Sequence, residues 1–422
     1  MKIERISVIG LGYIGLPTAA MFASRKLEVI GVDVNERAVD TINRGEIHIV
    51  EPDLDMVVQA AVKEGYLRAT TTPEPADAFL IAVPTPFEGK NHQPDLRFIE
   101  AACQSIAPML APGNLVILES TSPVGATEKM SGWLAAARPD LSFPQDAGEE
   151  SDVRIAHCPE RVLPGKVMQE LISNDRVIGG MTPICSAHAV ALYKLFVRGE
   201  CVVASSPRAA EMAKLTENSF RDVNIAFANE LSMICDDLDI NVWELISLAN
   251  RHPRVNILQP GPGVGGHCIA VDPWFIVSSS PERAKLIRVA REVNDAKPAW
   301  VLEKINAAVS GFLIDHPEKA AHEVSIACYG LAFKADIDDL RESPALRIVR
   351  EVVGTHPGRT MVVEPNVDII PSDLNCGTLV GQAEAERSAD VHVLLVDHSQ
   401  FKNMERPRKG EIVDARGVWR ER

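Results

Sequence analysis

One cysteine of the chain stands at the end of a glycine-rich run. The run from Gly261 to His267 holds four glycines and a proline just before Cys268, so it suits a tight loop that a ligand can approach closely better than a helix or strand. Asp272 and Pro273 follow, a pair typical of the N-cap and first residue of a helix. The sequence therefore predicts Cys268 just ahead of a helix N-terminus, where partial positive charge favours a thiolate.

A thiolate combined with a hydride acceptor can take an oxidation past the aldehyde. An alcohol becomes an aldehyde by losing one hydride, but the aldehyde carbon must gain a nucleophile before a second hydride can leave. Cysteine supplies such a nucleophile, and the thioester that results can be hydrolysed. The alternative is that Cys268 is a small buried hydrophobic residue, as most cysteines are; its glycine loop argues for the reactive role.

A dinucleotide-binding motif near the start of the chain predicts the hydride acceptor. The apolar run 6–9 leads directly into Gly10–Gly15, which reads Gly-Leu-Gly-Tyr-Ile-Gly, and a helical pattern follows. The next apolar run, 29–32, ends in Asp33, the placement found in strand-turn-helix-strand units that bind dinucleotides. An incidental glycine turn is the alternative, and the position of Asp33 argues against it.

The residues of this motif have separate physical tasks. Gly10 allows the tight turn, Gly12 lets the pyrophosphate approach the backbone, and Gly15 lets the helix pack closely on the strand. The helix N-terminus then faces the phosphates. Asp33 would accept hydrogen bonds from the adenine ribose and repel a 2′-phosphate, so the pattern favours NAD over NADP.

Two further strands are predicted at 79–83 and 115–119, and both end in turn residues that include proline. Open α/β sheets bind their ligands at the carboxyl ends of the strands. Thr85 and Thr121, which follow these strands, are therefore candidate contacts to the nicotinamide half of the cofactor. Ordinary turn chemistry before a proline is the alternative for each threonine.

A long helix is predicted from Pro207 to about Asp236, because apolar residues recur there with helical spacing and breakers are few. Lys214, Asn218 and Arg221 fall on one face of it. That face could be solvated, or it could line a pocket in which a lysine stabilises an oxyanion or moves a proton. His252 and Arg254 precede the glycine loop, as a surface turn or as contacts to an anionic substrate.

The last third of the chain resembles a second nucleotide-binding sheet. A buried-type strand at 324–329 runs into Gly330–Lys334, and two more parallel strands are predicted at 361–364 and 391–396. This last third of the chain has no G-x-G-x-x-G motif, so a second dinucleotide is not expected. Lys334 could hold the phosphates of a single nucleotide.

Length and composition set the general class of the protein. The 422 residues suggest about two to three domains. The net charge of −15 argues against general binding to nucleic acid or to an anionic membrane. The eight cysteines are scattered, which indicates reduced, intracellular thiols. Metal-ligand spacings, a signal peptide and an apolar run of roughly 20 residues are all lacking, so we expect a soluble, cytoplasmic protein without a metal.

The predicted fold class is α/β, with two Rossmann-like doubly wound domains joined by a long central helix. Residues 1–206 are expected to form the NAD-binding domain. Residues 207–309 are expected to form a central helical domain that carries the catalytic lysine and the cysteine loop, and residues 310–422 a nucleotide-binding α/β domain.

Together the motifs resemble the nucleotide-sugar 6-dehydrogenases of the UDP-glucose/GDP-mannose dehydrogenase family, over essentially the whole chain. The resemblance rests on Gly10–Gly15 with Asp33, Ser120–Gly125, Pro159–Val162, Lys214 with Asn218, Gly265–Cys268 with Asp272, and Phe333-Lys334 with Arg341–Ser343. It implies a four-electron oxidation of C6 of a UDP-sugar to the uronic acid, with two NAD used in turn. It also implies a homodimer joined through the central helix.

The resemblance also assigns roles to individual residues. Cys268 is implied to form a thiohemiacetal and a thioester, with Lys214 as proton carrier and oxyanion stabiliser, while Asp272, Thr121 and Glu160 position water or move protons. The implied cofactor contacts are Gly10, Gly12, Tyr13, Ile14, Gly15, Asp33, Thr85, Thr121, Thr127 and Arg341. The implied substrate contacts are Arg161, Val162, Lys214, Asn218, Arg221, His252, Arg254, Gly265, Phe333, Lys334 and Arg416, of which Arg254 would reach the substrate of the partner subunit.

Two departures from the UDP-glucose members concern the sugar. Those members usually carry a smaller residue at the position of His267 and lack a close match to His252–Arg254, so the chain resembles the branch acting on N-acetylated sugars. The implied substrate is UDP-N-acetyl-D-mannosamine, oxidised for surface polysaccharide synthesis, with UDP-GlcNAc or UDP-glucose as alternatives. A single-step β-hydroxyacid dehydrogenase would not explain Cys268 or the third domain. A non-catalytic NAD-binding protein would not explain the intact Lys214, Asn218 and Cys268.

Overall fold

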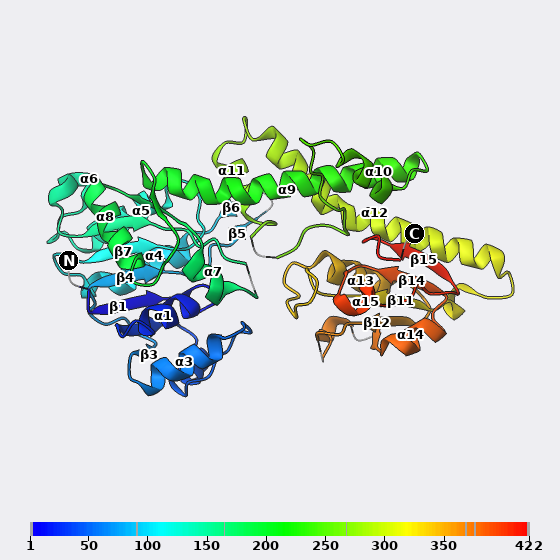
Figure 1. Cartoon of the computed structure of the whole chain (residues 1–422), viewed down its shortest axis with the longest axis horizontal. Coiled ribbons are helices and arrows are strands. Elements are labelled where there is room, and N and C mark those ends of the chain that lie inside the picture. The colour runs from blue at the N-terminus through cyan, green and yellow to red at the C-terminus, as the bar shows by residue number, and fades with distance from the viewer. Residues whose placement is uncertain are drawn as a thin grey trace. The chain divides into compact units, whose positions relative to one another are not determined.

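The computed structural model (Figure 1) describes residues 3–89, 92–163, 165–266, 268–367, 369–374 and 377–419. It divides into two compact units. The first contains residues 1–217 and 274–281, and the second contains residues 218–273 and 282–422. The chain passes from the first unit to the second within the 31-residue helix α9 (Pro207–Asp237).

The first unit is built on an eight-stranded sheet in the order β10-β9-β8-β7-β4-β1-β2-β3. Its strands are β1 (Arg5–Ile9), β2 (Glu28–Val32), β3 (Leu67–Thr70), β4 (Ala78–Ile81), β7 (Leu115–Leu118), β8 (Arg154–His157), β9 (Arg176–Gly180) and β10 (Cys201–Val203), with a separate hairpin of β5 (Phe87–Glu88) and β6 (Gln93–Pro94). All neighbours in the large sheet are parallel except β8 and β9, which are antiparallel.

Helices cover both faces of this sheet. They are α1 (Gly15–Ala23), α2 (Glu36–Asn43), α3 (Leu54–Lys63), α4 (Arg97–Ile106), α5 (Ala126–Ala137), α6 (Pro144–Ala147), α7 (Val167–Ser173) and α8 (Pro183–Tyr193). In the fully buried strand β7, Leu115 and Ile117 join an apolar cluster with α1, α3 and α8, while Val116 and Leu118 join a second cluster with α4 and α5. Successive side chains of a strand point to opposite faces, so the sheet is doubly wound.

The second unit contains a five-stranded, fully parallel sheet in the order β13-β12-β11-β14-β15. Its strands are β11 (Ile326–Tyr329), β12 (Thr360–Val363), β13 (Gly377–Leu379), β14 (Val391–Leu394) and β15 (Glu411–Asp414), and its helices are α10 (Val242–Ala249), α12 (Lys285–Asp315), α13 (Pro344–Thr355), α14 (Gln382–Ser388) and α15 (Ser399–Lys402). Helix α11 (Asp272–Ser279) contributes residues to both units. Side chains of α12 and α13 pack on one face of the sheet, and those of α14 and α15 on the other.

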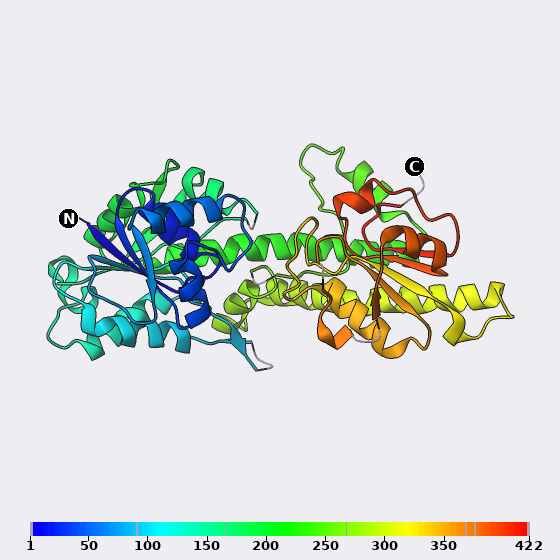
Figure 2. The same cartoon turned by 90° about the horizontal axis from the view of Figure 1, so that it is seen from below.

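Polar contacts hold the second half of α9 beside α12 (Figure 2). Arg291 and Asp222 form a fully buried ion pair, and Asn294 donates to the same aspartate at 2.8 Å. Asn229 donates to Asn294 at 2.9 Å. Leaving any of these buried groups without a partner would be costly, so the network fixes the register of the two helices.

The observed elements confirm the predicted α/β class with two Rossmann-like sheets and a long central helix. The predicted helix from Pro207 to about Asp236 ends at Asp237. Helix α12 continues to Asp315, past the residue at which the last domain was predicted to begin. The three-domain division itself stays a prediction.

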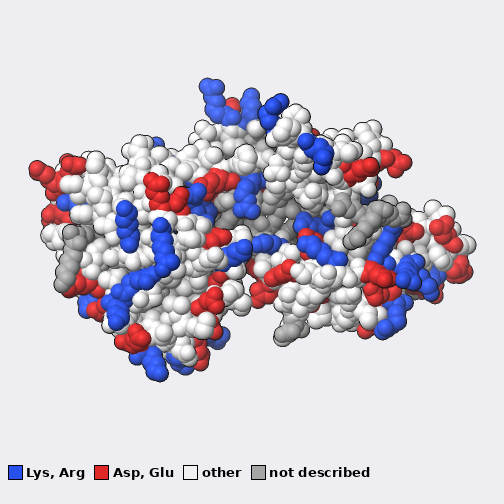
Figure 3. Space-filling model, viewed as in Figure 1, with Lys and Arg blue, Asp and Glu red and all other residues white. Residues whose placement is uncertain are grey.

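The structure also shows the distribution of surface charge and the apolar character of the helices. On the face drawn in Figure 3, Lys and Arg are interspersed with Asp and Glu. Within the described ranges, no helix is both long enough and apolar enough to cross a membrane. The cysteines that the structure describes, seven of eight, form no disulfide.

Candidate active site

Five of the predicted residues in the first unit follow five neighbouring strands. Asp33 follows β2, Gly10 follows β1, Thr85 lies beyond β4, Thr121 beyond β7 and Glu160 beyond β8. These strands are adjacent and parallel, so their carboxyl ends meet at one edge of the sheet. The structure therefore brings these five predicted residues to the same edge of the sheet.

The glycine turn of the first unit fits a dinucleotide. Gly10 has a positive φ of +91°, and a side chain on Gly15 would place its Cβ 1.8 Å from the Gly10 carbonyl oxygen. A side chain on exposed Gly12 would meet no atom within 4 Å, so a ligand can approach the backbone there. The Leu11 amide donates to the Asp33 carboxylate at 2.8 Å, which fixes the acidic group beside the turn. These residues fit NAD as the sequence motif predicts.

The three threonines predicted to contact the cofactor differ in their burial and their hydrogen bonds. Thr85 Oγ1 is buried and has no hydrogen-bond partner among the described residues, and its cofactor role stays a prediction. Thr121 is partly exposed. Thr127 gives both its amide and its hydroxyl to the carboxylate of Glu211. The cofactor role of Thr127 stays a prediction, and its polar groups already have a protein partner.

The carboxylate of Glu160 lies in a buried ionic network. Arg176 pairs with it at 2.6 Å, and the Arg161 amide donates to its other oxygen at 2.6 Å. The Arg176 guanidinium also stacks over the Tyr193 ring, whose hydroxyl donates to Glu119 at 2.5 Å. Glu160 and Arg176 are both buried. The predicted proton-transfer residue is thus held in one position by a buried cation.

The sequence interpretation missed Glu119, Tyr193 and Arg176 in this network. Glu119 alone carries a sequence signal, because it is an acidic residue at the end of an apolar strand. Burial raises its pKa to about 7, against the opposing effect of Arg176. Tyr193 and Arg176 come from α8 and β9, and nothing in the local sequence connects them with Glu160.

Glu119 is expected to make stability depend on pH. Its pKa is about 7 in the folded protein and 4.5 as the unperturbed reference value, so the folded state keeps a proton that the unfolded chain loses. The contribution of Glu119 to the free energy of unfolding is therefore fully present below about pH 4.5, declines as the pH rises through about 7, and is constant above that.

The variant E119Q copies the protonated form at every pH. We expect it to match the wild type in urea denaturation near pH 4.5 and to exceed it by about 3 kcal/mol at pH 8, since each pKa unit corresponds to about 1.4 kcal/mol. The exposed carboxylate of Glu128, changed to glutamine, is the control. A stability difference that is the same at both pH values would contradict the assignment.

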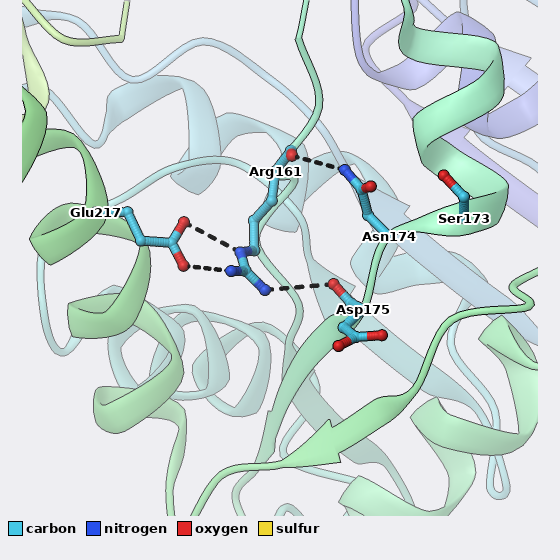
Figure 4. Close-up of a pocket in the computed structure, with 5 residues that line it drawn as sticks. All are labelled: Arg161, Ser173, Asn174, Asp175 and Glu217. Atoms are coloured by element: carbon cyan, nitrogen blue, oxygen red, sulfur yellow. Dashed lines mark hydrogen bonds and ion pairs between the residues drawn. The ribbon is translucent and has the colours of Figure 1, made fainter.

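Arg161, a predicted substrate contact, lines a polar cavity of about 420 Å³ (Figure 4). Its guanidinium contacts Glu217 at 2.6 Å and donates to the Asp175 carbonyl at 3.3 Å, while Asn174 donates to the Arg161 carbonyl at 3.3 Å. Val162, the next predicted contact, packs against the apolar core of the first unit. A substrate that binds Arg161 would therefore compete with Glu217 for its guanidinium.

Lys214 and Asn218 lie one turn apart on α9, and both are buried. Lys214 is 9% exposed, and no carboxylate of the first unit pairs with its ammonium among the described residues. Most of the Lys214 side chain is therefore out of solvent, which favours a ligand-binding or catalytic role over a solvated helix face. Arg221, on the following turn, is exposed.

In the second unit Cys268 is exposed at the end of the glycine-rich loop. Its carbonyl oxygen accepts from the Asp272 amide at 2.9 Å, so the chain turns directly into α11, which begins at Asp272. The Asp272 carboxylate accepts from the Asn218 side chain at 2.5 Å, with both residues buried. The helix start predicted after Cys268 is confirmed, and Asp272 is held by the amide of Asn218.

The glycines of this loop lie against the second sheet. A Cβ on Gly265 would lie 2.5 Å from the Glu342 carbonyl oxygen and 2.8 Å from the Phe333 Cβ, and one on Gly261 would lie 2.4 Å from the Arg416 guanidinium. A larger residue at Gly265 would push the loop away, whereas at Gly261 the flexible Arg416 side chain could move aside. The structure thus brings three predicted substrate residues, Gly265, Phe333 and Arg416, together beside the loop that carries Cys268. His267 lies outside the described residues.

The other predicted residues of the second unit are more exposed. Arg341 is paired with Asp339 at 2.6 Å, and Lys334 is exposed in the loop after β11. His252 and Arg254 are exposed in the loop after α10, where the Arg254 amide meets His252 Nδ1 at 3.4 Å. Among the described residues no hydrogen bond or ion pair joins these two residues to Phe333 or Lys334, and their substrate role stays a prediction.

The second sheet repeats the turn of the first. Gly330 has a φ of +96°, and the following amide, of Leu331, donates to the Glu364 carboxylate at 2.7 Å, as Leu11 donates to Asp33. His398 contacts the same carboxylate at 3.1 Å. Sequence interpretation missed Glu364 and His398. The acidic residue after the second strand of the unit is a signal that could have located Glu364.

Within the part of the chain that the structure describes, no three His, Cys, Asp or Glu residues are grouped so that they could hold a metal ion.

Comparisons with known proteins cover the chain almost completely. Models of the UDP-glucose/GDP-mannose dehydrogenase family match its NAD binding domain at residues 4–197, its central domain at 208–296 and its UDP binding domain at 327–421. The chain is 68% identical to UDP-N-acetyl-D-mannosamine dehydrogenase of Yersinia pestis over 100% of both chains. It is 65% identical to NDP-N-acetyl-D-galactosaminuronic acid dehydrogenase of Ralstonia nicotianae, over 98% of this chain and 96% of that one.

A solved structure shows the same fold. UDP-D-ManNAc dehydrogenase from Pyrococcus horikoshii superposes with a TM-score of 0.87 at 38% identity, covering 99% of this chain and 96% of that one.

Proposed function

The chain belongs to the UDP-glucose/GDP-mannose dehydrogenase family, and from this premise we propose that it oxidises UDP-N-acetyl-D-mannosamine at C6 to the uronic acid. It is an NAD-dependent dehydrogenase acting on a UDP-sugar. The observation that carries the proposed chemistry is the position of the Cys268 loop. That loop packs on Phe333 and Arg416 within the unit that contains the match to the UDP binding domain.

Two relatives support an N-acetylated sugar. The Yersinia pestis relative is named for UDP-N-acetyl-D-mannosamine and the Ralstonia nicotianae relative for an N-acetyl-galactosaminuronic acid. Their similar identities to this chain make a UDP-linked N-acetyl-galactosamine the second candidate. UDP-GlcNAc and UDP-glucose remain alternatives from the sequence interpretation.

The proposed chemistry at Cys268 has three stages after the alcohol has become an aldehyde. The thiolate adds to C6 and the aldehyde oxygen takes a proton, which gives a thiohemiacetal. That carbon then loses a hydride and its hydroxyl loses a proton, which leaves a thioester. Water attacks the thioester carbonyl and releases the carboxylate and the thiolate. When bound, NAD accepts the hydride in each of the two oxidations, so two NAD are consumed per sugar.

The protein residues divide this work among them. The buried Lys214 ammonium is suited to stabilise the oxygen at C6 and to exchange its proton. Asp272, held by Asn218 at 2.5 Å, is suited to orient the hydrolytic water. Glu160 is fixed by Arg176, which favours a positioning or electrostatic task for it beside Thr121.

The sugar can be settled by measuring NADH formation on a panel of nucleotide sugars. We expect kcat/KM to be highest for UDP-ManNAc, and at least roughly tenfold above UDP-GalNAc, UDP-GlcNAc, UDP-glucose and GDP-mannose. Buried polar groups that recognise a substituent are left unpaired when the sugar lacks it or carries it in another configuration. A higher value for UDP-GalNAc would establish the second candidate. Equal use of UDP-glucose would contradict recognition of the acetamido group.

We also propose a homodimer built on α9. Phe220, Phe227 and Ile234 are 69%, 55% and 44% exposed on this helix, and their spacing of seven residues places them on one face. A row of exposed large apolar side chains indicates an interface. The family resemblance places Arg254 at the substrate of the partner subunit, and its exposure in the loop after α10 is compatible with that.

The dimer predicts a change of mass in a specific variant. The double variant F220D/F227D should sediment as a monomer in analytical ultracentrifugation. Each subunit would otherwise bury two unpaired charges in the interface. The control M56D places an aspartate at an exposed residue of α3, and it should leave the mass of the assembly unchanged. A doubly substituted protein that keeps the wild-type mass would place the interface elsewhere.

Three broader expectations are proposed on sequence grounds. The product is expected to enter a surface polysaccharide, and the enzyme to work in the cytoplasm. The absence of disulfides among the described cysteines supports the second expectation. The three-domain division is supported by the three family models.

A further inference from the structure

A buried carboxylate connects α9, which carries Lys214, to α5, the helix that follows the loop containing Thr121. Glu211 lies on α9 one turn before Lys214 and is 1% exposed. One of its oxygens accepts from the Gly125 amide at 2.6 Å, and the other accepts from the Thr127 amide at 2.8 Å and the Thr127 hydroxyl at 2.6 Å. All three donors belong to the first turn of α5 or to the residue before it.

Helix α5 depends on this contact for its N-terminal cap. The first amides of a helix have no partner within the helix, and Gly125, at the N-cap position with a φ of +94°, has no side chain to supply one. Glu211 therefore caps α5 from a different helix. Its carboxylate also lies where the partial positive charge of the helix end favours an anion.

Capping alone does not explain a buried carboxylate. A serine, threonine or asparagine at the N-cap would satisfy the Thr127 amide without bringing a charge out of water. Burial raises the pKa of Glu211, against the hydrogen bonds from Thr127 and Gly125. The feature that a local cap would lack is the connection between α5 and α9.

We propose that Glu211 is a positioning residue that fixes Lys214 relative to the loop containing Thr121. Thr121 lies four residues before Gly125, and Lys214 lies three residues after Glu211. Only a few residues therefore separate each of them from the three hydrogen bonds that join α5 and α9. The inference rests on the proposed function, in which Lys214 and Thr121 take part in the reaction. Its physical basis is that small misplacements of reacting groups cost large factors in rate.

The chain offers a matched control between the same two helices. Arg208 of α9 and Glu128 of α5 form an ion pair at 2.6 Å, with side chains 59% and 40% exposed. Exposed pairs of this kind contribute little to stability. The variant E128Q therefore makes the same chemical change as E211Q, on a contact that joins the same helices without buried hydrogen bonds.

The test compares E211Q and E128Q with the wild type in the full-length protein. The glutamine of E211Q has one oxygen and one NH₂ group, so at least one of the three groups that donate to Glu211 faces another donor. We therefore expect the Gly125 and Thr127 amides to exchange hydrogen at least roughly tenfold faster than in the wild type. We expect kcat to fall about 30- to 100-fold, while the dissociation constant of NAD changes less than about threefold. E128Q should match the wild type in all three measurements.

Three results would overturn the proposal. The first is a kcat for E211Q within about threefold of the wild type. The second is a loss of kcat in E128Q equal to that in E211Q. The third is faster amide hydrogen exchange spread evenly over the first unit, which would mean that Glu211 only stabilises the fold. Exchange and NAD binding are measured without turnover. Failure of the proposed function would look different. The wild-type protein would then oxidise none of the nucleotide sugars, although its Gly125 and Thr127 amides would still be protected from exchange.

Discussion

The C268S variant is expected to form uronic acid at least about 10⁴-fold more slowly than the wild-type protein. A serine hydroxyl has nearly the size of the thiol but is not ionised near neutral pH, so C6 of the aldehyde gains no covalent partner. The glycine loop can keep its packing on Phe333, since Cys268 is exposed and serine is no larger. The measurement is mass spectrometry of the uronic acid in reactions with excess NAD.

A second cysteine provides the control for that experiment. Cys201, at the start of β10, is partly exposed and lies in the first unit, so C201S should retain wild-type activity. If C268S made uronic acid at a rate within tenfold of the wild type, Cys268 would not be the nucleophile. The thioester route would then have to be abandoned.

The K214M variant is expected to lose about 10²- to 10³-fold in kcat, the cost typical of removing a group that stabilises a developing oxyanion. Methionine keeps the length and apolar stem of lysine, so packing along α9 is preserved. Lys214 is buried without a carboxylate partner among the described residues of its unit, so the substitution leaves no unpaired anion there. A thermal unfolding scan of K214M should therefore show a midpoint at or above that of the wild type.

The exposed lysine at the end of α8 provides a matched comparison. K194M removes the same charge from the surface of the first unit and should leave kcat unchanged. A K214M protein with normal kcat and a raised KM would assign Lys214 to substrate binding alone. That outcome would remove it from the chemical steps.

The dinucleotide half of the site was predictable because its signals are local. The turn needs glycine at fixed offsets, and the acidic residue must end the next strand, so Gly10, Gly15 and Asp33 reveal the strand, turn and helix together. The same reasoning predicted that Thr85 and Thr121 follow the carboxyl ends of two strands, where the structure shows them. The family resemblance that these motifs supported is confirmed by the full-length matches.

The supporting side chains were not predictable because their partners are distant in sequence. Glu211 lies 84 residues from Thr127, and Tyr193 lies 74 residues from Glu119, so periodicity and spacing carry no trace of either contact. The packing of the glycine loop was also hidden. Gly265 marks a tight approach, but only the fold shows that Phe333 and Glu342 are what it approaches.

The most direct test of the whole account is the stoichiometry of the complete reaction. Wild-type protein, excess NAD and a limiting amount of UDP-N-acetyl-D-mannosamine should be allowed to react to completion, with NADH and the sugar products both counted. We predict two NADH and one uronic acid for each UDP-sugar consumed. One NADH per sugar, with the aldehyde as the final product, would contradict the four-electron oxidation and the role proposed for Cys268.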